Sequence, residues 1–456
     1  MLSITGADLI VEDFADPTRD HGGALVIDAN GRVAAPDAAT SPGSAGTGET
    51  PDETADETLD ATGCIVTPGL VNAHHHLLQS GFRTLPGTRG VPMRDWLPAM
   101  AAAYARAGID RPLVEATAAV GLAESLLSGV TTVADHQLNW PDPAASSDPV
   151  DATVEIARGV RAAARSLGAR LVFVRGSARD DPRLAAASAD AIASDLLGAE
   201  HVGGLTPDGL LQVAVGPAGV HSDAEETFRA LGDVARRHGL RRRTQANEQV
   251  DTEIALSRYG RRPLDLLAEW GWLEPGVTIA HLCDVTEDEI ALLAASGVTA
   301  THAPGCDVPM GWGIAPVHAL RAAGIVVGLG TSGGGSNDAG HLLADARLAM
   351  QVSALVGPQL PARTVLEMAT RGGADGLGRP TLGRLAPGAD GDACAWDVSG
   401  VADAGVDDPV AGLLWAAPGR RPRHVVVAGR VVVRDYRLIT ADEPGLVAAL
   451  RDRVSR

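Results

Sequence analysis

Short strand-like runs alternate with longer amphipathic stretches over most of the chain. Eight such runs, most of them apolar, lie at residues 64–71, 129–135, 170–175, 211–216, 240–247, 276–281, 297–302 and 325–331. Stretches with apolar residues at helical spacing occupy residues 111–128, 151–167, 223–238, 284–296, 315–323 and 341–355. Strands that alternate with helices form parallel βαβ units. The pattern therefore predicts an α/β protein, a (β/α)8 barrel of the TIM type, with functional groups at the carboxyl ends of its strands.

Both ends of the chain carry strand patterns of a different kind. Short runs at residues 2–5, 24–28 and 32–34 are separated by turn residues, and strand patterns return at 393–396 and in a hairpin at 424–433. The simplest arrangement joins the two ends. We expect residues 1–65 and 380–456 to form one small β-sandwich domain beside a catalytic barrel at residues 66–379.

Residues 36–60 differ from both parts in composition. They consist mainly of Ser, Thr, Gly, Pro and Ala, with seven acidic residues and no basic residue. Such a segment buries too little apolar surface to order itself. We expect a mobile acidic insertion at the surface.

Composition narrows the classes of partner. The net charge of −19 disfavours nucleic acid and anionic membrane surfaces as partners. The chain contains no apolar run long enough to span a membrane and no secretory pattern, so a cytoplasmic location is expected. Its four cysteines are scattered, which fits a reducing compartment.

All 38 basic residues are arginines. The absence of lysine excludes a Schiff-base lysine, a phosphate-loop lysine and a carbamylated lysine that bridges two metal ions. A metal site in this chain is therefore expected to hold one ion.

Polar side chains stand where the predicted strands end. His74 and His76 follow the first strand, and residues two apart on a strand point to the same side. Two converging neutral imidazoles suit a divalent metal ion, although a surface histidine run or packed histidines would produce the same pattern. The ends of the later strands carry Gln245, Glu248, His281, His302, Thr331, Ser332, Asn337 and Asp338. Because the carboxyl ends of barrel strands meet on one face, we expect a functional pocket there.

Several motifs resemble those of the amidohydrolase superfamily. They are Pro-Gly-Leu-Val-Asn-Ala-His-His-His at 68–76, Gly-Val-Thr-Thr-Val-Ala-Asp at 129–135, the strand-six histidine, and Gly-Leu-Gly-Thr at 328–331 before Ser-Asn-Asp at 336–338. Within that superfamily the chain is similar to the aminohydrolases and chlorohydrolases of nitrogen heterocycles. Met-Gly-Trp-Gly-Ile-Ala-Pro at 310–316 looks closest to the triazine hydrolase branch, which includes N-ethylammeline chlorohydrolase-like proteins, and members like 8-oxoguanine deaminase are also similar. The likeness covers nearly the whole chain outside residues 36–60.

The resemblance implies a hydrolase of a small nitrogen heterocycle. One divalent ion per chain, zinc first and iron as the alternative, would lower the pKa of a bound water. The resulting hydroxide would displace an amine or a halide from an electron-poor ring carbon. His74 and His76 would bind the ion, His281 would bind it or hold the hydroxide, and Glu248 would transfer protons. The family also suggests a homodimer.

Two positions depart from the family pattern. Gln245 stands where the family usually has a metal-binding histidine, and Ser332 stands where it usually has a catalytic aspartate. An amide oxygen is a poor zinc ligand beside imidazole, and a hydroxyl is a far weaker base than a carboxylate. His74, His76 and His281 would still form a three-histidine site with one open position. The alternative is an amidohydrolase-fold protein that is metal-independent or catalytically repurposed.

Other residues are expected to line the pocket. They are Gln79, Trp96, His136, Gln137, Arg175, His302, Trp312 and Asn337. Trp96 and Trp312 would stack on a flat heterocycle, although both also fit the role of core aromatics, and His302 fits a packed strand-end histidine. Cys283 and Cys306 lie near the same face as soft ligands or nucleophiles, but buried inert thiols are the simpler interpretation.

Overall fold

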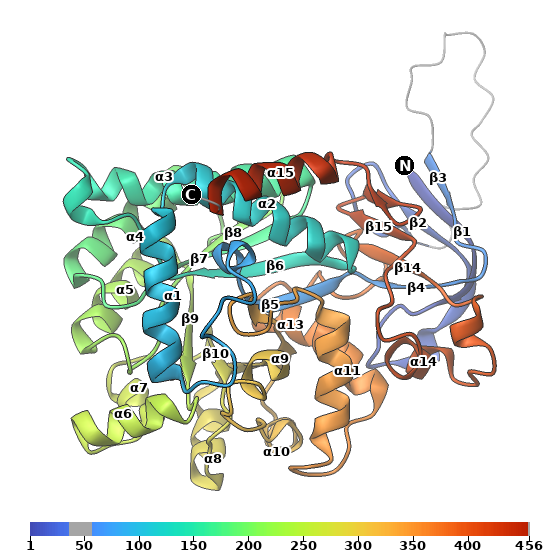
Figure 1. Ribbon diagram of the computed structural model, residues 1–456. Helices are drawn as coiled ribbons and strands as arrows, with labels where there is room; N and C mark the ends of the chain where they lie inside the picture. The colour runs from blue at the N-terminus through green and yellow to red at the C-terminus, as the bar shows by residue number, and fades with distance from the viewer. Residues whose placement is uncertain (36–56, 455–456) are drawn as a thin grey trace.

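Nine strands of the computed structural model, which describes residues 1–35 and 57–454, form a parallel sheet that closes into a barrel (Figure 1). In spatial order they are β12 (Val327–Leu329), β11 (Thr299–His302), β10 (Val277–His281), β9 (Arg241–Ala246), β8 (Leu211–Pro217), β7 (Arg170–Ser177), β6 (Val130–Gln137), β5 (Leu70–His76) and β13 (Ser332–Gly333). Small apolar residues such as Val71, Ala134, Val172 and Ala214 fill its interior. The predicted (β/α)8 barrel is confirmed.

The eighth strand of the barrel is interrupted. Its first part, β12, pairs with β11, and its second part, β13, pairs with β5, where Ser332 lies opposite His75 and Gly333 opposite His76. Gly330 and Thr331 separate the two parts, and Ser332 has a left-handed φ of 54°. The barrel therefore closes at the histidine-rich strand that the sequence singled out.

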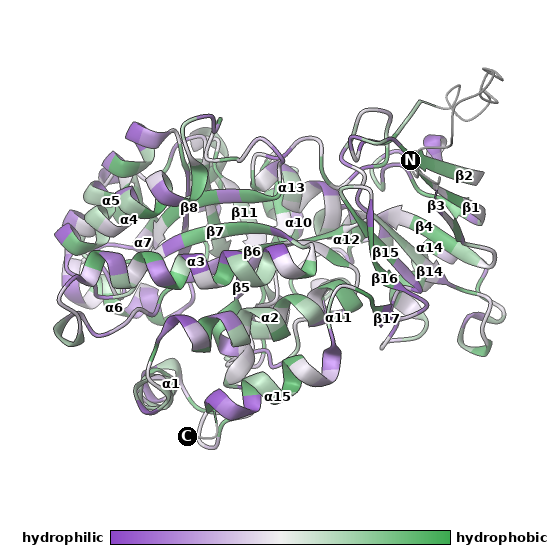
Figure 2. Cartoon of the chain, turned by 90° about the horizontal axis from the view of Figure 1, so that it is seen from above, coloured by the Kyte–Doolittle hydropathy of each residue, from purple (hydrophilic) through white to green (hydrophobic). Residues whose placement is uncertain are grey.

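Helices surround the barrel, and the larger ones have one apolar side. Their bounds are α1 (Met93–Ala107), α2 (Arg111–Leu127), α3 (Pro149–Leu167), α4 (Pro182–Leu197), α5 (Glu225–His238), α6 (Val250–Tyr259), α7 (Pro263–Glu269), α8 (Glu287–Ser296), α9 (Pro304–Asp307), α10 (Val317–Ala322), α11 (Leu342–Ser353), α12 (Ala362–Glu367) and α13 (Gly373–Gly376). Hydrophobic and hydrophilic residues alternate along them in Figure 2, as expected for helices that cover a core.

Local sequence explains where several helices begin. Asp110, Asp148 and Asp181 each precede a helix with proline at its first or second position, and their side chains accept hydrogen bonds from backbone N–H groups of the first turn. Thr286 and Glu289 form a reciprocal capping box at α8. Because this cap uses the first residues of the predicted helix 284–296, the helix itself begins at Glu287. No helix among the described residues is long and apolar enough to cross a membrane.

The two ends of the chain form a second, mixed sheet. Its strands are β1 (Leu2–Ile10), β2 (His21–Ile27), β3 (Glu57–Asp60), β4 (Cys64–Pro68), β14 (Ala393–Asp397), β15 (His424–Val427), β16 (Arg430–Arg434) and β17 (Arg437–Leu438). The central pairing is antiparallel, between β4 and β14, so the first and last segments lie side by side (Figure 1). The predicted terminal β-unit is confirmed as this one sheet, while the domain bounds stay a prediction.

The expected insertion at 36–60 requires a correction at its end. Residues 36–56 lie outside the described residues, but Glu57–Asp60 forms strand β3, which pairs in parallel with β1. Leu59 is buried there among the apolar residues of the terminal sheet. One apolar anchor and a complete backbone ladder order this segment in spite of its polar composition.

Two helices belong to the C-terminal region. Helix α14 (Pro409–Trp415) follows β14, and α15 (Glu443–Val454) returns to the outside of the barrel, where both views show it beside α2 (Figures 1 and 2). No side chain of α15 is fully buried, so this helix has no need of an apolar side. Its sequence accordingly lacks the apolar spacing that would have predicted a helix.

A buried ion cluster, the Arg170 joint, connects the barrel to the terminal sheet. It consists of Arg170 at the start of β7 with Asp390 and Asp392 just before β14. The Arg170 guanidinium donates from Nε and Nη2 to the Asp392 carboxylate at 3.0 Å and from Nη1 to the Gly209 carbonyl at 2.9 Å. Asp392 Oδ1 also accepts from the Ala428 backbone N–H at 2.8 Å. Each charge therefore has partners on both sides of the connection.

Candidate metal centre and active site

His74 and His76 come together at the end of β5, with ring centroids 4.9 Å apart. Both side chains are buried. His76 Nδ1 lies 2.7 Å from the carbonyl oxygen of His136 and donates to it, which leaves Nε2 as the atom with a free lone pair. His74 Nε2 is buried and has no hydrogen-bond partner among the described residues. Two imidazole nitrogens at this strand end are thus available to a ligand.

The middle histidine of the run, His75, has a structural role on the opposite side of β5. Its Nδ1 lies 2.5 Å from the Ser332 carbonyl oxygen and 2.8 Å from Thr331 Oγ1. Asn72 reinforces the same connection, since its Nδ2 donates to Thr331 Oγ1 at 2.8 Å. His75 therefore helps to join the first strand of the barrel to the eighth.

His281 stands at the end of β10 and faces the first two histidines. Its ring centroid lies 5.2 Å from that of His74. Nδ1 is 2.6 Å from Asp307 Oδ1, and Nε2 is 3.0 Å from Gln245 Oε1. Burial by itself disfavours the charged imidazole, but the Asp307 and Glu248 carboxylates outweigh it and raise the pKa of His281. The backbone is left-handed at this point, with φ of 77° at His281.

Glu248 is the carboxylate beside these imidazoles. Both of its carboxylate oxygens are buried and lack a hydrogen-bond partner among the described residues, and Oε1 lies 3.6 Å from His281 Nε2. Burial raises the pKa of Glu248 to about 8. Its backbone is fixed by Asp251, which accepts from the Glu248 N–H at 2.5 Å. We call His74, His76, His281 and Glu248 the histidine pocket.

The histidine pocket fits a divalent cation. Three imidazoles and one carboxylate are a donor set that zinc accepts, and the unpartnered His74 Nε2 and Glu248 oxygens are polar atoms that a cation would satisfy. Burial and the neighbouring imidazoles lower the pKa of His74 well below its ordinary value, which keeps the ring in the neutral form that binds metals.

The two departures from the family pattern have distinct places. Gln245 lies in the pocket through its contact with His281 Nε2. Ser332 lies on the interrupted eighth strand, where its carbonyl accepts from His75, and its side chain brings no charge to the pocket. Position 245 can therefore influence a bound ion directly, while position 332 serves the closure of the barrel.

Some of the predicted lining residues adjoin the pocket. The His136 ring centroid lies 5.9 Å from those of both His74 and His76, and Trp312 lies edge-on to His281 at 5.2 Å. Other predicted lining residues use their polar groups elsewhere. Gln79 Oε1 accepts from the Gly335 N–H at 3.0 Å, and Trp96 Nε1 donates to the Gly335 carbonyl at 3.1 Å.

Those last contacts bear on the glycine that ends β13. A Cβ atom at Gly333 would overlap the Gln79 side chain, so a larger residue there would displace Gln79 from its contact with Gly335. Asn337 donates to the Thr331 carbonyl at 2.9 Å and steadies the same loop. Gln137 donates from Nε2 to the Asn139 carbonyl at 2.6 Å.

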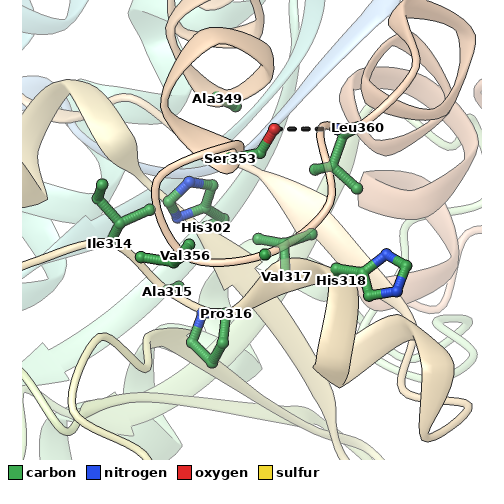
Figure 3. Close-up of a pocket in the computed structure, with 11 residues that line it drawn as sticks. His302, Ile314, Ala315, Pro316, Val317, His318, Ala349, Ser353, Val356 and Leu360 are labelled. Carbon is green, nitrogen blue, oxygen red and sulfur yellow. Dashed lines mark hydrogen bonds between the residues drawn. The ribbon is translucent and has the colours of Figure 1, made fainter.

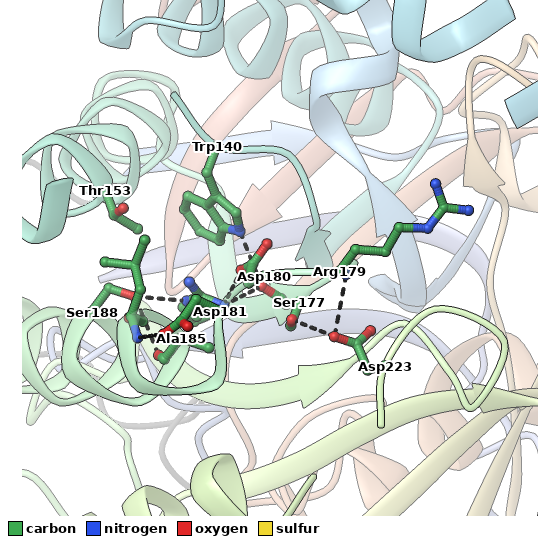
Figure 4. Close-up of polar contacts among 12 residues, drawn as sticks. Trp140, Thr153, Ser177, Arg179, Asp180, Asp181, Ala185, Ser188 and Asp223 are labelled. Atoms are coloured by element: carbon green, nitrogen blue, oxygen red, sulfur yellow. Dashed lines mark hydrogen bonds and ion pairs between the residues drawn. The ribbon is translucent and has the colours of Figure 1, made fainter. Parts of the chain in front are cut away.

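Arg175 lies in a separate polar network on the outside of the barrel. Figure 4 labels its partners Ser188, Asp180 and Trp140. Its guanidinium donates to Ser188 on α4 and to Asp180, and it stacks 4.8 Å from the centre of the Trp140 ring. The sequence pattern ends strand three at Arg175, but β7 continues to Ser177. The structure therefore does not bring Arg175 together with the histidine pocket.

His302 lies at the end of β11, between Asp307 and a small cavity. Its Nδ1 is 3.6 Å from Asp307 Oδ2. On its other side, Figure 3 shows the ring among apolar residues of the cavity wall, including Ile314, Val317 and Leu360. His302 is thus one residue removed from the pocket and contacts it through Asp307.

The two nearby cysteines are buried or partly buried thiols. Burial and the Asp307 charge raise the pKa of both Cys283 and Cys306, which keeps them protonated. Cys306 forms a compact group with His281 and Asp307, whose ligand atoms all lie within 4.8 Å of one another. The structure gives neither cysteine the exposed, cationic surroundings of a nucleophile.

Sequence reasoning missed Asp307, which is fully buried and contacts two histidines. Asp307 lies five residues beyond the end of β11, in the short helix α9. A search for polar residues at strand ends stops too early to include it. The nearby His302 was the available signal.

Comparison with known proteins decides the family. Residues 65–432 match the pattern described as the Amidohydrolase family. The chain belongs to the amidohydrolase family. This match covers the whole barrel and extends into the terminal sheet.

Known amidohydrolases resemble the chain along most of its length. The 8-oxoguanine deaminase of Pseudomonas aeruginosa is 33% identical over 428 residues, which cover 90% of this chain and 91% of that protein. A 5-methylthioadenosine/S-adenosylhomocysteine deaminase of Halobacterium salinarum is also 33% identical, with 90% and 89% covered. The chain is therefore similar to deaminases of heterocyclic compounds.

A solved structure gives the same result for the fold. Atrazine chlorohydrolase TrzN from Arthrobacter aurescens TC1, crystallised with zinc, superposes with a TM-score of 0.87 at 31% identity and covers all of both chains. The protein is thus an amidohydrolase-family hydrolase of the deaminase and chlorohydrolase type, and one of its relatives holds zinc.

Proposed function

We propose that the protein hydrolyses a small nitrogen heterocycle and displaces an exocyclic amine or a halide from an electron-poor ring carbon. The observation that carries the proposal is the histidine pocket, where a buried carboxylate without a partner, Glu248, lies beside three imidazoles at the carboxyl ends of the barrel strands. Deaminase and chlorohydrolase relatives support the same reaction class.

In this proposal His74, His76 and His281 hold one divalent cation, with zinc preferred because a relative contains it. When bound, the cation would supply Lewis acidity that makes water a nucleophile near neutral pH. Gln245 would stay beside His281 as a neutral amide. The position of its oxygen, 3.0 Å from His281 Nε2, lets it orient a polar group of the substrate once that nitrogen is engaged.

Glu248 is the proton-transfer residue. Its oxygens face the pocket without competing hydrogen bonds, so they can accept a proton from water and return it to a ring nitrogen or to the leaving group. His136 and Trp312 flank the same space, and their flat rings suit a flat heterocycle. The low pKa of buried His74 and His76 prevents these rings from competing for the transferred proton.

The test is a screen of oxopurine, cytosine-like, pterin and triazine compounds for released ammonia or chloride. With a compound that reacts, Glu248→Gln should lower kcat by about 10²–10⁴-fold, the usual contribution of a general acid–base group. Glu225→Gln, on the exposed side of α5, serves as the control and should keep the wild-type rate. A Glu248→Gln variant with undiminished turnover would refute this mechanism.

A second function has one specific observation in its favour. Gln245 and the uncharged Ser332 leave His281 Nε2 in contact with an amide oxygen rather than with a metal-binding neighbour. A protonated His281 between Asp307 and Gln245 could act as the acid of a metal-independent reaction. Metal analysis of the purified protein decides between the two functions, because about one zinc per chain excludes the metal-independent one. If the metal content is negligible and stays so in the double variant Gln245→His and Ser332→Asp, the first proposal fails.

A further inference from the structure

Asp307 is a fully buried carboxylate near the histidine pocket, and its ion pairs are of an unusual kind. Its side chain is wholly buried, yet among the described residues its ion-pair partners are the imidazoles of His281 and His302, at 2.6 and 3.6 Å. No arginine in the described part of the chain forms an ion pair with it. The main electrostatic effect of the Asp307 carboxylate therefore falls on these two imidazoles.

The backbone holds Asp307 rigidly. Its N–H donates to the Ala303 carbonyl at 3.0 Å, and its own carbonyl accepts from the Trp312 N–H at 3.0 Å. The adjacent Gly305 makes room for the neighbouring carboxylate of Asp345, since a Cβ atom there would lie 2.2 Å from Asp345 Oδ1. The Asp307 carboxylate therefore has a fixed position with respect to β10.

His281 is held equally firmly from its own strand. The chain turns through left-handed residues at His281 and Leu282, with φ of 77° and 56°, and the Leu282 N–H donates to the Ala246 carbonyl at 3.0 Å. The imidazole is then fixed by two contacts, Nδ1 with Asp307 and Nε2 with Gln245. With Nδ1–H donated to a carboxylate, Nε2 is the nitrogen that can offer a lone pair to a cation once its contact with the Gln245 oxygen is released.

The distribution of charge in the site suggests what the contact between Asp307 and His281 does. His74, His76 and His281 are neutral donors, and Thr331 and Ser332 at the nearby end of the eighth strand bring no charge. Glu248 is the one carboxylate of the histidine pocket, and a second carboxylate behind a metal-binding histidine adds negative charge and increases the basicity of that histidine.

We propose that Asp307 is a positioning residue of the metal centre, which holds His281 with its proton on Nδ1 and its Nε2 directed into the pocket, and supplies negative charge through the imidazole. The proposal rests on the proposed function only in so far as that function places a divalent cation at His281.

The first experiment measures zinc affinity by competition with a chromophoric chelator. Asp307→Asn keeps the shape of the side chain and removes its charge, and should weaken zinc binding by about 10–100-fold. Asp223→Asn is the matched control, because Asp223 is also buried at this end of the barrel but accepts from Ser177 and Ser222 and contacts no histidine. The control should bind zinc as the wild type does. Equal zinc affinity of Asp307→Asn and the wild type overturns the proposal, as does a wild-type protein that binds no zinc.

The second experiment reads the histidine directly and does not depend on the Asp307→Asn variant. In protein labelled with ¹⁵N-histidine, the His281 signals, assigned with His281→Gln, should show a proton on Nδ1 with and without zinc. A wild-type signal with the proton on Nε2 and a bare Nδ1 overturns the proposal. A protein that binds zinc with this tautomer but hydrolyses no heterocycle refutes the proposed function and leaves the role of Asp307 intact.

Discussion

Buried charged groups lie at both the amino and the carboxyl ends of the barrel strands. The two sets differ in how many of their polar atoms have a hydrogen-bond partner. At the amino end of β7, the Arg170 joint satisfies its charges with Asp390, Asp392, a carbonyl and a backbone N–H. At the carboxyl ends, His74 Nε2 and both Glu248 oxygens have no hydrogen-bond partner among the described residues. The satisfied charges of the joint hold two parts of the structure together, whereas the unsatisfied atoms of the histidine pocket are available to something that binds.

This contrast separates residues that stabilise the fold from residues that serve a reaction. Breaking the joint leaves a buried carboxylate without its partner and should lower stability. Changing the pocket removes atoms that contribute little to the fold and should alter binding and turnover instead. The following experiments test the contrast from the largest expected effect to the smallest.

The largest effect is expected at the joint. Arg170→Met should lower the free energy of unfolding by about 3–5 kcal/mol, because Asp392 stays buried without its guanidinium. Chemical denaturation followed by circular dichroism measures the loss. Arg236→Ala is the control, since its ion pair with Asp233 is exposed and should contribute at most about 1 kcal/mol. Equal losses in the two variants would show that the joint is no more important than a surface pair.

An intermediate effect is expected when zinc is added to chelator-treated protein. At a zinc concentration about 100 times the dissociation constant, binding to the folded state raises the free energy of unfolding by about 2.7 kcal/mol. His74→Ala removes one of the proposed donors and should abolish this gain. His21→Ala, at the exposed start of β2 in the terminal sheet, should keep it. Thermal unfolding with and without zinc measures both. A gain that survives in His74→Ala contradicts the assignment of the pocket.

The smallest effect, measured over a single pH unit, is a pH dependence at Asp345, a carboxylate near the pocket that accepts from Gly305 and Asn337. Burial raises the pKa of Asp345 to about 7, above the value of about 3.9 for an exposed aspartate. The folded protein then binds more protons than the unfolded chain between about pH 4 and pH 7. The stabilising contribution is present below this window and is lost as the pH rises through it, with a slope of at most about 1.4 kcal/mol per pH unit.

The measurement compares unfolding free energies of the wild type and Asp345→Asn across this range. Asparagine has no proton to lose, so the stability difference between the two proteins should shift in favour of the variant as the pH rises. Asp233→Asn, at an exposed site, should show no such shift. A flat difference for Asp345→Asn would show that the carboxylate is ionised throughout.

Most of the barrel and half of the site could be predicted because they depend on local pattern. Buried parallel strands are continuous apolar runs, and the residue that ends such a run is brought to the catalytic face by topology alone. That reasoning places His74, His76 and His281 together, and Glu248 follows two residues after the end of its strand. The direction of a side chain is a separate question. Val172 and Val174 point into the barrel, so alternation along β7 turns Arg175 outward to Ser188.

The remaining features depend on partners that are distant in sequence. Arg170 begins a strand and meets Asp392, 222 residues later, which no local pattern indicates. Asp307 belongs to a short helix after its strand, and its partner His281 lies 26 residues earlier on another strand. The role of His75 becomes visible only when the eighth strand is seen to close against the first. Long-range pairing, rather than residue type, decides these roles.

The pairing of β4 with β14 has a consequence for the synthesis of the protein. The ribosome completes β4 at Pro68 and reaches β14 only at Ala393. At about 5–20 residues per second, roughly 15 to 65 seconds separate the two strands. During that time β4 presents an apolar strand with an open edge, which other nascent chains can pair with. The yield of native protein should therefore respond to translation speed and to chaperones that cover strand edges, even where the finished molecule is stable.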